Sequence, residues 1–286
     1  MLSNKVSEIM SKQLTTVPAT MSTFEVMDMM ASADVGRVIV TDKDVPVGIF
    51  TERDIVRRVI HVGLEANKIP VRKVMTAPIQ TVSEETHIIE ALGKMYQGKY
   101  RHLLVRGRHG KIVGIVSMRR ILGIAVELGQ GLKETQTVGE VISEPAVTVD
   151  QFLTLAEIVN LMIDKNAVAV IVTSGENSAG IFTERDVLKR VATKGIDIKV
   201  SQVRDFMTSP LITMPNRALI GEVLTEMYRH DIRNMPITNE SKELIGIMSM
   251  SDILQYAKAL DIDETVRKSW KEVQEYFDST DQYTPG

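Results

Sequence analysis

The stretch GIFTERD occurs twice in this chain, at residues 48–54 and again at 180–186. Two related stretches share its spacing: GIVSMRR begins at Gly114 and GIMSMSD begins at Gly246. The four glycines, Gly48, Gly114, Gly180 and Gly246, are therefore each 66 residues apart. Because a fixed period of this length is typical of repeated supersecondary units, the sequence predicts four repeats.

A second pattern supports the same period. It reads VSEIM at residue 6, VRKVM at 71, VGEVI at 138 and VRDFM at 203. Ten residues after the first valine of each pattern stands a threonine: Thr16, Thr81, Thr148 and Thr213. Two anchors that agree in four copies therefore both predict the repeat.

Each repeat reads as a short extended piece, an amphipathic helix, two strands around a polar turn and a closing helix. The predicted fold class is α/β, with four strand–helix–strand–strand–helix repeats. We expect the repeats to span 1–62, 63–129, 130–194 and 195–260, followed by a helix and tail over 261–286. A unit of this size has a small core and an exposed sheet face, so we expect the repeats to pair.

The composition limits the classes of function. The chain has 286 residues, 44% hydrophobic and 25% charged residues, a net charge of −3 and no cysteine. It has no basic field for nucleic acid, no signal peptide and no apolar run that could span a bilayer, so we expect a soluble, cytoplasmic protein. The five histidines have no metal spacing, and no Walker, GxGxxG or HExxH motif occurs. We therefore expect no catalytic residues, no metal and no enzyme activity.

The repeats alternate in kind. Repeats 1 and 3 share GIFTERD, whereas repeats 2 and 4 share an arginine followed by a polar residue ahead of the middle strand, Arg101-His102 and Arg233-Asn234. The chain therefore reads as a duplicated pair of repeats.

Together, four such units with Gly-x-x-Thr/Ser-x-x-Asp after the last strand resemble cystathionine-β-synthase (CBS) domains over residues 5–257. The resemblance implies two Bateman modules, each a pair of repeats related by a pseudo-twofold axis with ligand clefts. It also implies a regulatory ligand that contains adenosine, such as AMP, ADP, ATP or S-adenosylmethionine, and a regulated protein partner. No catalytic cofactor is implied.

Three repeats carry a hydroxyl and an acid three residues later: Thr51 and Asp54, Thr183 and Asp186, Ser249 and Asp252. One interpretation is a capping box that starts the closing helix. The other is a ligand site, since a free helix start favours phosphate and an Asp accepts both ribose hydroxyls. The two interpretations are compatible.

The resemblance gives further candidate ligand contacts. It implies that Arg101, His102, Arg233 and Asn234 contact phosphate, with surface salt bridges as the alternative. It implies that the backbone at Thr16, Thr81, Thr148 and Thr213 holds the adenine edge, although threonine is also an ordinary strand residue.

Repeat 2 departs from the pattern, because Arg120 stands where the other repeats carry an acid. A guanidinium accepts no hydrogen bond, so this repeat should lose the ribose contact. We expect either that Arg120 contacts the phosphate of a ligand whose ribose is held by Asp54 of the paired repeat 1, or that the site of repeat 2 stays empty. The pattern of three acids resembles the gamma subunits of AMP-activated protein kinase.

The C-terminal segment predicts one more helix, with Val266, Trp270, Val273 and Phe277 on one stripe. It either packs on its own module or docks a partner.

The whole sequence predicts a non-enzymatic, energy-sensing protein that binds adenine nucleotides between repeats and changes its interaction with a partner. The alternatives are a scaffold without a physiological nucleotide and a regulatory subunit of a heteromeric enzyme or kinase. Formation of a homodimer is left open.

Overall fold

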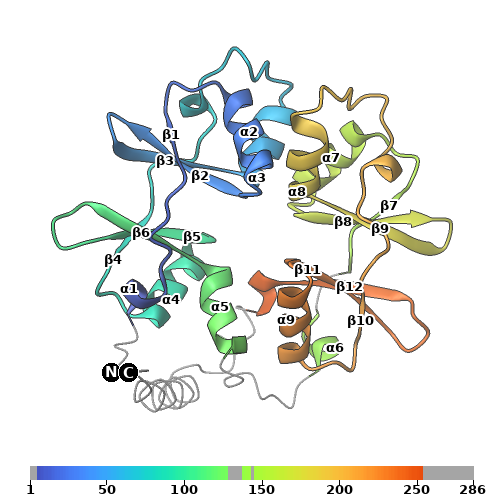
Figure 1. The fold of residues 1–286 in the computed structure, drawn as a ribbon. Coiled ribbons are helices and arrows are strands. Elements are labelled where there is room, and N and C mark those ends of the chain that lie inside the picture. The colour runs from blue at the N-terminus through green and yellow to red at the C-terminus, as the bar shows by residue number, and fades with distance from the viewer. Residues whose placement is uncertain (1–4, 128–136, 143–144, 254–286) are drawn as a thin grey trace, which may run out of the picture. The chain divides into compact units, whose positions relative to one another are not determined.

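The computed structural model describes residues 5–127, 137–142 and 145–253. Within these residues each repeat contains one three-stranded sheet with a helix between its first two strands (Figure 1). The predicted fold of four strand–helix–strand–strand–helix repeats is confirmed. The predicted helix with Val266 and Trp270 lies outside the described residues.

The four sheets have one topology. In each, the first strand pairs in parallel with the second, and the second pairs antiparallel with the third. The strands of repeats 1 and 2 are β1 (Thr16–Pro18), β2 (Arg37–Asp42), β3 (Val45–Thr51), β4 (Thr81–Ser83), β5 (His102–Arg106) and β6 (Ile112–Ser117). Those of repeats 3 and 4 are β7 (Thr148–Asp150), β8 (Ala169–Ser174), β9 (Asn177–Thr183), β10 (Met214–Pro215), β11 (Asn234–Thr238) and β12 (Leu244–Ser249).

A central helix crosses between the parallel strands of every repeat. These helices are α2 (Thr23–Ser32), α4 (Ile88–Gly98), α7 (Leu155–Asp164) and α9 (Ile220–Arg229). Two of them start with a capping box: the Ser22 amide donates to Glu25 at 3.1 Å, and the Thr154 amide donates to Glu157 at 2.8 Å. Each box satisfies backbone groups that the first helical turn leaves unpaired.

The closing helices begin directly after the third strand. They are α3 (Glu52–Asp54), which continues as the π-helical turn η1 (Ile55–Ile60), α5 (Met118–Glu127), and α8 (Glu184–Asp186), which continues as the π-helical turn η3 (Val187–Ala192). Residues 250–253 are also helical. The hydroxyl residue of each motif is therefore the last residue of a strand and the first cap of a helix.

The opening turns of neighbouring repeats are exchanged. They are α1 (Val6–Ile9), η2 (Val71–Lys73), α6 (Val138–Val141) and η4 (Val203–Asp205). The chain after α1 pairs with repeat 2, where the Ser11 amide donates to Ile115 O at 2.9 Å, and the chain after η2 pairs with repeat 1, where the Ile49 amide donates to Thr76 O at 3.0 Å. Repeats 3 and 4 exchange in the same way, through α6 on repeat 4 and η4 on repeat 3. Each repeat is thus completed by a segment that the chain order assigns to its neighbour.

Contacts divide the chain into two compact units. The 1/3 unit holds repeats 1 and 3 (Leu14–Ile79 and Ala146–Ile212), and the 2/4 unit holds repeats 2 and 4 (Met1–Gln13, Gln80–Pro145 and Thr213–Gly286). Repeats are therefore grouped alternately and not in chain order. Arg120, which the sequence analysis assigned to a ligand shared with Asp54, belongs to a different unit from Asp54.

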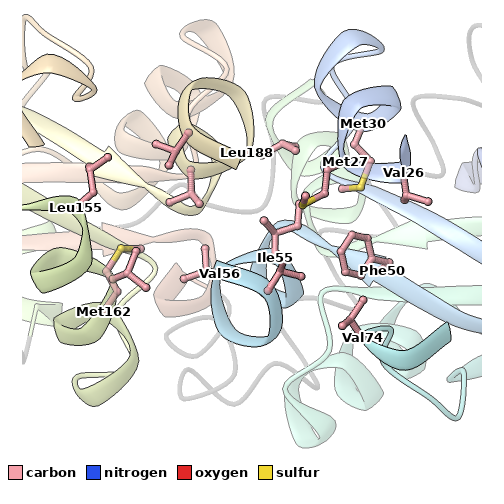
Figure 2. Packing of buried hydrophobic residues seen from close by; sticks show 14 of the residues in the cluster. Val26, Met27, Met30, Phe50, Ile55, Val56, Val74, Leu155, Met162 and Leu188 are labelled. Atoms are coloured by element: carbon pink, nitrogen blue, oxygen red, sulfur yellow. The ribbon is translucent and has the colours of Figure 1, made fainter. Parts of the chain in front are cut away.

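Each unit has its own apolar core, built from both of its repeats. In the 1/3 unit, Ile55 and Val56 of repeat 1 belong to the same cluster as Met162 and Leu188 of repeat 3 (Figure 2). One buried methionine recurs on every central helix: Met30, Met95, Met162 and Met227. None of the helices in the described part of the chain has the length and apolar character that a membrane span requires.

Candidate ligand-binding site

The closing helix of repeat 1 starts with a complete capping box. The Asp54 carboxylate accepts hydrogen bonds at Oδ2 from the Thr51 amide at 2.9 Å and from the Thr51 hydroxyl at 2.7 Å. The Asp54 amide donates back to the Thr51 hydroxyl at 3.4 Å. The capping interpretation of Thr51 and Asp54 is confirmed.

The second oxygen of Asp54 is also engaged. It accepts a hydrogen bond from the Thr76 hydroxyl at 2.7 Å, and the Arg58 Nε lies 3.6 Å away. Asp54 is only 5% exposed. A buried carboxylate is stable when each of its oxygens has donors, and both oxygens of Asp54 have them.

Repeat 3 reproduces this arrangement because its residues are the same. Asp186 Oδ2 accepts from the Thr183 amide at 2.9 Å and the Thr183 hydroxyl at 2.7 Å. Asp186 Oδ1 accepts from the Thr208 hydroxyl at 3.0 Å, with Arg190 Nη1 at 3.5 Å. Asp186 is likewise buried.

Repeat 4 has the same cap, but its acid is exposed to solvent. Asp252 Oδ2 accepts from the Ser249 amide at 2.7 Å, and the Asp252 amide donates to the Ser249 hydroxyl at 3.3 Å. Asp252 is exposed, and among the described residues its Oδ1 receives no hydrogen bond. Of the three predicted acids, Asp252 is therefore the one placed to accept hydrogen bonds from a ligand without losing an existing partner.

Repeat 2 keeps the hydroxyl of the cap without the acid. The Arg120 amide donates to the Ser117 hydroxyl at 3.1 Å, and the Arg120 side chain is exposed. The start of α5 therefore offers backbone amides and a cation, which suit an anion and provide no acceptor for a ribose hydroxyl.

The predicted phosphate contacts lie at the helix starts. His102 is the register partner of Ser117, and Asn234 is the register partner of Ser249. The preceding arginines accept hydrogen bonds on their carbonyl groups from the first helical residues: the Met118 amide donates to Arg101 at 3.0 Å. The Met250 amide donates to Arg233 at 3.3 Å. Register thus brings each arginine–polar pair beside the cap of its own repeat.

The same register identifies a candidate that the sequence analysis missed. Arg37 is the partner of Thr51 in repeat 1, as His102 is the partner of Ser117 in repeat 2. The spacing of 65 residues between Thr16 and Thr81 also separates Arg37 from His102, and this signal could have found it. Repeat 3 has Ala169 at this position, opposite Thr183, and so lacks the cation.

The four threonines do not all fall in strands. Thr16, Thr81 and Thr148 are the first residues of β1, β4 and β7, while Thr213 precedes β10. Thr16 and Thr148 are exposed. A backbone role for these residues at an adenine edge stays a prediction.

Comparison with known proteins identifies the family. The model of the CBS domain matches residues 6–61, 71–127, 138–193 and 203–259. A CBS domain-containing protein of Arabidopsis thaliana is 27% identical over 87% of this chain and 53% of its own length. A protein of Methanocaldococcus jannaschii is 27% identical over 90% of this chain and 62% of its own length. The chain thus spans about half of the length of the Arabidopsis relative.

Two solved structures have the same fold. One is a Methanocaldococcus jannaschii protein described as an archaeal homologue of the gamma subunit of AMP-activated protein kinase, with a TM-score of 0.77, 20% identity, and coverage of 88% of this chain and 99% of that one. The other comes from Pyrococcus horikoshii, with a TM-score of 0.59, 20% identity and the same coverages. With four matched domains and this fold, the chain belongs to the CBS domain family.

Proposed function

We propose that this chain is a non-catalytic regulatory protein that binds an adenine nucleotide at the helix starts of its repeats. The ligand would be AMP, ADP or ATP, held as a regulatory ligand and not as a catalytic cofactor. The observation that carries the proposal is Asp252, an exposed acid beside a helix start and beside Arg233 and Asn234, whose Oδ1 receives no hydrogen bond from the described residues.

Each part of such a ligand has a chemically suitable partner in repeat 4. A ribose diol donates two hydrogen bonds, and Asp252 Oδ1 accepts them while Oδ2 continues to cap the helix. A phosphate suits the guanidinium of Arg233 and the amide of Asn234. No other predicted motif combines the open acid, the helix start and the arginine in one repeat.

The other repeats should bind differently. In repeats 1 and 3, a ribose that used Asp54 or Asp186 would compete with the Thr76 or Thr208 hydroxyl for Oδ1. Thr51 and Thr183 would stay as caps. In repeat 2, Arg101, His102 and Arg120 favour phosphate alone. We therefore propose at most three ribose-bound nucleotides per chain, with repeat 4 the strongest site.

Regulation would follow from a shift in population. A ligand that binds one arrangement of the repeats better than another favours that arrangement, and a partner protein reads the difference. The likeness in fold to a protein described as a homologue of a kinase gamma subunit supports this class of role. A regulatory subunit of a heteromeric enzyme is one form that the role would take.

The test is nucleotide binding, measured by the shift in melting temperature and by calorimetric titration. AMP, ADP, ATP and S-adenosylmethionine should be compared at millimolar concentration, because a ligand that binds the folded state alone raises the melting temperature. Asp252→Asn removes the charge and keeps the shape, and should weaken binding by about 1–3 kcal/mol. Glu240→Gln, in the turn after β11, is the matched control for loss of one charge and should bind as the parent does.

A scaffold without a ligand is the second candidate function. The bonded, buried states of Asp54 and Asp186 favour it, because they show these acids serving the fold. If no adenosine compound shifts the melting temperature at millimolar concentration, the scaffold is correct and the nucleotide proposal is wrong.

A further inference from the structure

The cap explains only the threonine and the aspartate of GIFTERD, and not the glutamate and arginine between them. Those two residues lie where α3 and α8 pack on each other (Figure 1). Arg53 Nε donates to Glu184 Oε1 at 3.2 Å, and Arg185 Nη1 lies 4.0 Å from Glu52 Oε1. The side chains of Glu52 and Glu184 are 5% and 7% exposed. Repeats 1 and 3 therefore meet through two contacts between corresponding residues, a hydrogen bond from Arg53 to Glu184 and a longer ion pair of Arg185 with Glu52, in which the glutamates are buried and the arginines are partly exposed.

Further contacts lie on both sides of these two glutamate–arginine contacts. Arg185 Nη2 lies 2.6 Å from Asp34 Oδ1, and Lys189 Nζ lies 2.5 Å from the same oxygen. On the mirrored side, Arg57 donates to the side chain of Asn166. Asp34 and Asn166 correspond, since both follow a central helix with positive φ, 54° and 50°. Each repeat thus presents cations on its closing helix and an acceptor at the end of its central helix.

Repeats 2 and 4 use a different set of residues at the same positions. Met118 and Met250, both buried, replace the two glutamates. Arg119 Nη2 lies 2.6 Å from Asp231 Oδ1, and its guanidinium stacks 5.1 Å from the centre of the Tyr228 ring. Among the described residues, this surface has two buried methionines at its centre and the Arg119–Asp231 ion pair at its edge.

The corresponding edge on the other side of the 2/4 unit has neither the arginine nor the acceptor. Ser251 stands where the other repeats have an arginine, and Lys99, with φ of 54°, stands where they have Asp34, Asn166 or Asp231. An arginine at 251 would meet a lysine, so the two replacements are consistent with each other. This pattern makes the surface of repeat 2 complementary to repeat 4 and not to a second copy of itself.

We propose that these residues form a self-recognition surface that determines which repeats pack together. The contacts of Arg53 with Glu184 and of Arg185 with Glu52 hold repeat 1 against repeat 3. The Arg119–Asp231 pair holds repeat 2 against repeat 4. A repeat 1 placed on repeat 4 would bury Glu52 and Arg53 against Met250 and Ser251, leaving charges without partners, which is strongly unfavourable. The inference does not depend on the proposed ligand.

The test uses the full chain, whose lack of cysteine allows clean thiol reporters. His61 Nδ1 lies 3.1 Å from Asn160 Oδ1 across repeats 1 and 3, and both residues are exposed. A chain with His61→Cys and Asn160→Cys, treated with a short bis-maleimide, should form a crosslink within one chain. Adding Glu184→Arg should lower the yield of this crosslink several-fold, because two arginines then face each other.

Adding Arg53→Glu to that variant reverses the pair and should restore most of the yield. The matched control reverses Glu65 and Lys68, an exposed ion pair of the 1/3 unit, and should change nothing. An unchanged yield with Glu184→Arg overturns the proposal. If Glu184→Arg fails to fold, the doubly reversed chain still decides: recovery of folding by circular dichroism supports the proposal, and no recovery contradicts it.

The 2/4 surface gives an independent test by melting temperature. Ser251→Arg alone should lower the melting temperature. The melting temperature of the double variant Ser251→Arg with Lys99→Asp should be higher than the sum of the two single shifts predicts, because a second arginine–aspartate pair is then complete. Lys99→Asp alone corrects for the preference of Asp for positive φ. Strict additivity of the two changes would contradict the proposed complementarity at this edge.

Discussion

Thr76 donates its hydroxyl hydrogen bond to Oδ1 of Asp54 at 2.7 Å, from an opening turn to the cap of the preceding repeat. Thr208 and Asp186 repeat the relationship at 3.0 Å. In both cases the acid joins three segments: the end of a strand, the start of a helix and the exchanged turn. The motif that resembles a ligand site is therefore also a structural joint.

The joint predicts the effect of removing one hydroxyl. Thr76→Val should lower the free energy of unfolding by about 1.5–3 kcal/mol, the usual value of a hydrogen bond to a charged group. Thr76→Ser keeps the hydroxyl and should lose much less. Urea unfolding of both variants measures the difference. Equal losses in the two variants would mean that the methyl group, and not the hydrogen bond, stabilises the joint.

Removal of the hydroxyl also bears on ligand binding. If ribose competes with Thr76 for Asp54, the Thr76→Val chain should bind an adenine nucleotide more tightly in repeat 1. Calorimetric titration of a chain that also carries Asp252→Asn and Asp186→Ala isolates this weaker site. Weaker binding in Thr76→Val would show that the threonine supports the ligand and does not compete with it.

Asp186→Ala separates capping from recognition. Loss of the cap alone should lower the free energy of unfolding by about 1 kcal/mol, and loss of the hydrogen bond from Thr208 should lower it further. If Asp186 also holds ribose, nucleotide affinity in repeat 3 should fall by about 1–3 kcal/mol. Unfolding and titration on the same variant give both quantities. A drop in stability with unaltered affinity would exclude the ribose role for Asp186.

Arg120→Asp tests the repeat without an acid. The change supplies the missing acceptor opposite Ser117 and removes a cation, so the number of bound nucleotides or their affinities should change. The parent chain should bind at most three nucleotides by calorimetry. A crystal of the parent with a ribose hydrogen-bonded at the start of α5 would contradict the prediction directly.

Asp34 predicts a dependence on pH. The hydrogen bond from Lys189, with Arg185 beside it, lowers the pKa of Asp34 below its ordinary value of 3.8. A depressed pKa adds stability that is complete above the unfolded-state pKa and is lost as the pH falls through the folded-state value. Because Asp34 is 55% exposed, the contribution should be at most about 1 kcal/mol.

Asp34→Asn is the suitable variant, since Asn166 occupies the same conformation in repeat 3. The difference in stability between the parent and Asp34→Asn should be largest at pH 5–7. It should shrink as the pH is lowered below 3.8 in urea unfolding. A difference that stays constant with pH would show that the charge of Asp34 contributes nothing.

Much of this architecture follows from the sequence, because the repeat period, the strand runs and the turns can be read along the chain. The 66-residue spacing predicts four repeats, and two short apolar runs around a polar turn predict β2 and β3. The caps at Thr51 and Thr183 also follow, since a hydroxyl and an acid three residues apart define them. What the sequence does not reveal is long-range. The bond from Thr76 to Asp54 and the contact of Arg53 with Glu184 join segments that no local pattern relates.

The candidate site shows the same limit. Asp54, Asp186 and Asp252 look equivalent in sequence, yet two are buried and bonded while the third is exposed. The difference lies in the hydroxyls of Thr76 and Thr208, which follow η2 and η4 and donate to the first two acids. Equivalence of motif therefore does not imply equivalence of chemical environment.

The exchanged opening turns also constrain how such a chain can lengthen. A single repeat copied alone would carry a turn with no sheet to receive it and a sheet with no turn to complete it. A pair of neighbouring repeats closes this exchange within itself, through α1 with η2 and through α6 with η4. The smallest segment that can be duplicated without leaving a turn or a sheet unpaired is therefore two repeats long, which is the interval at which GIFTERD returns.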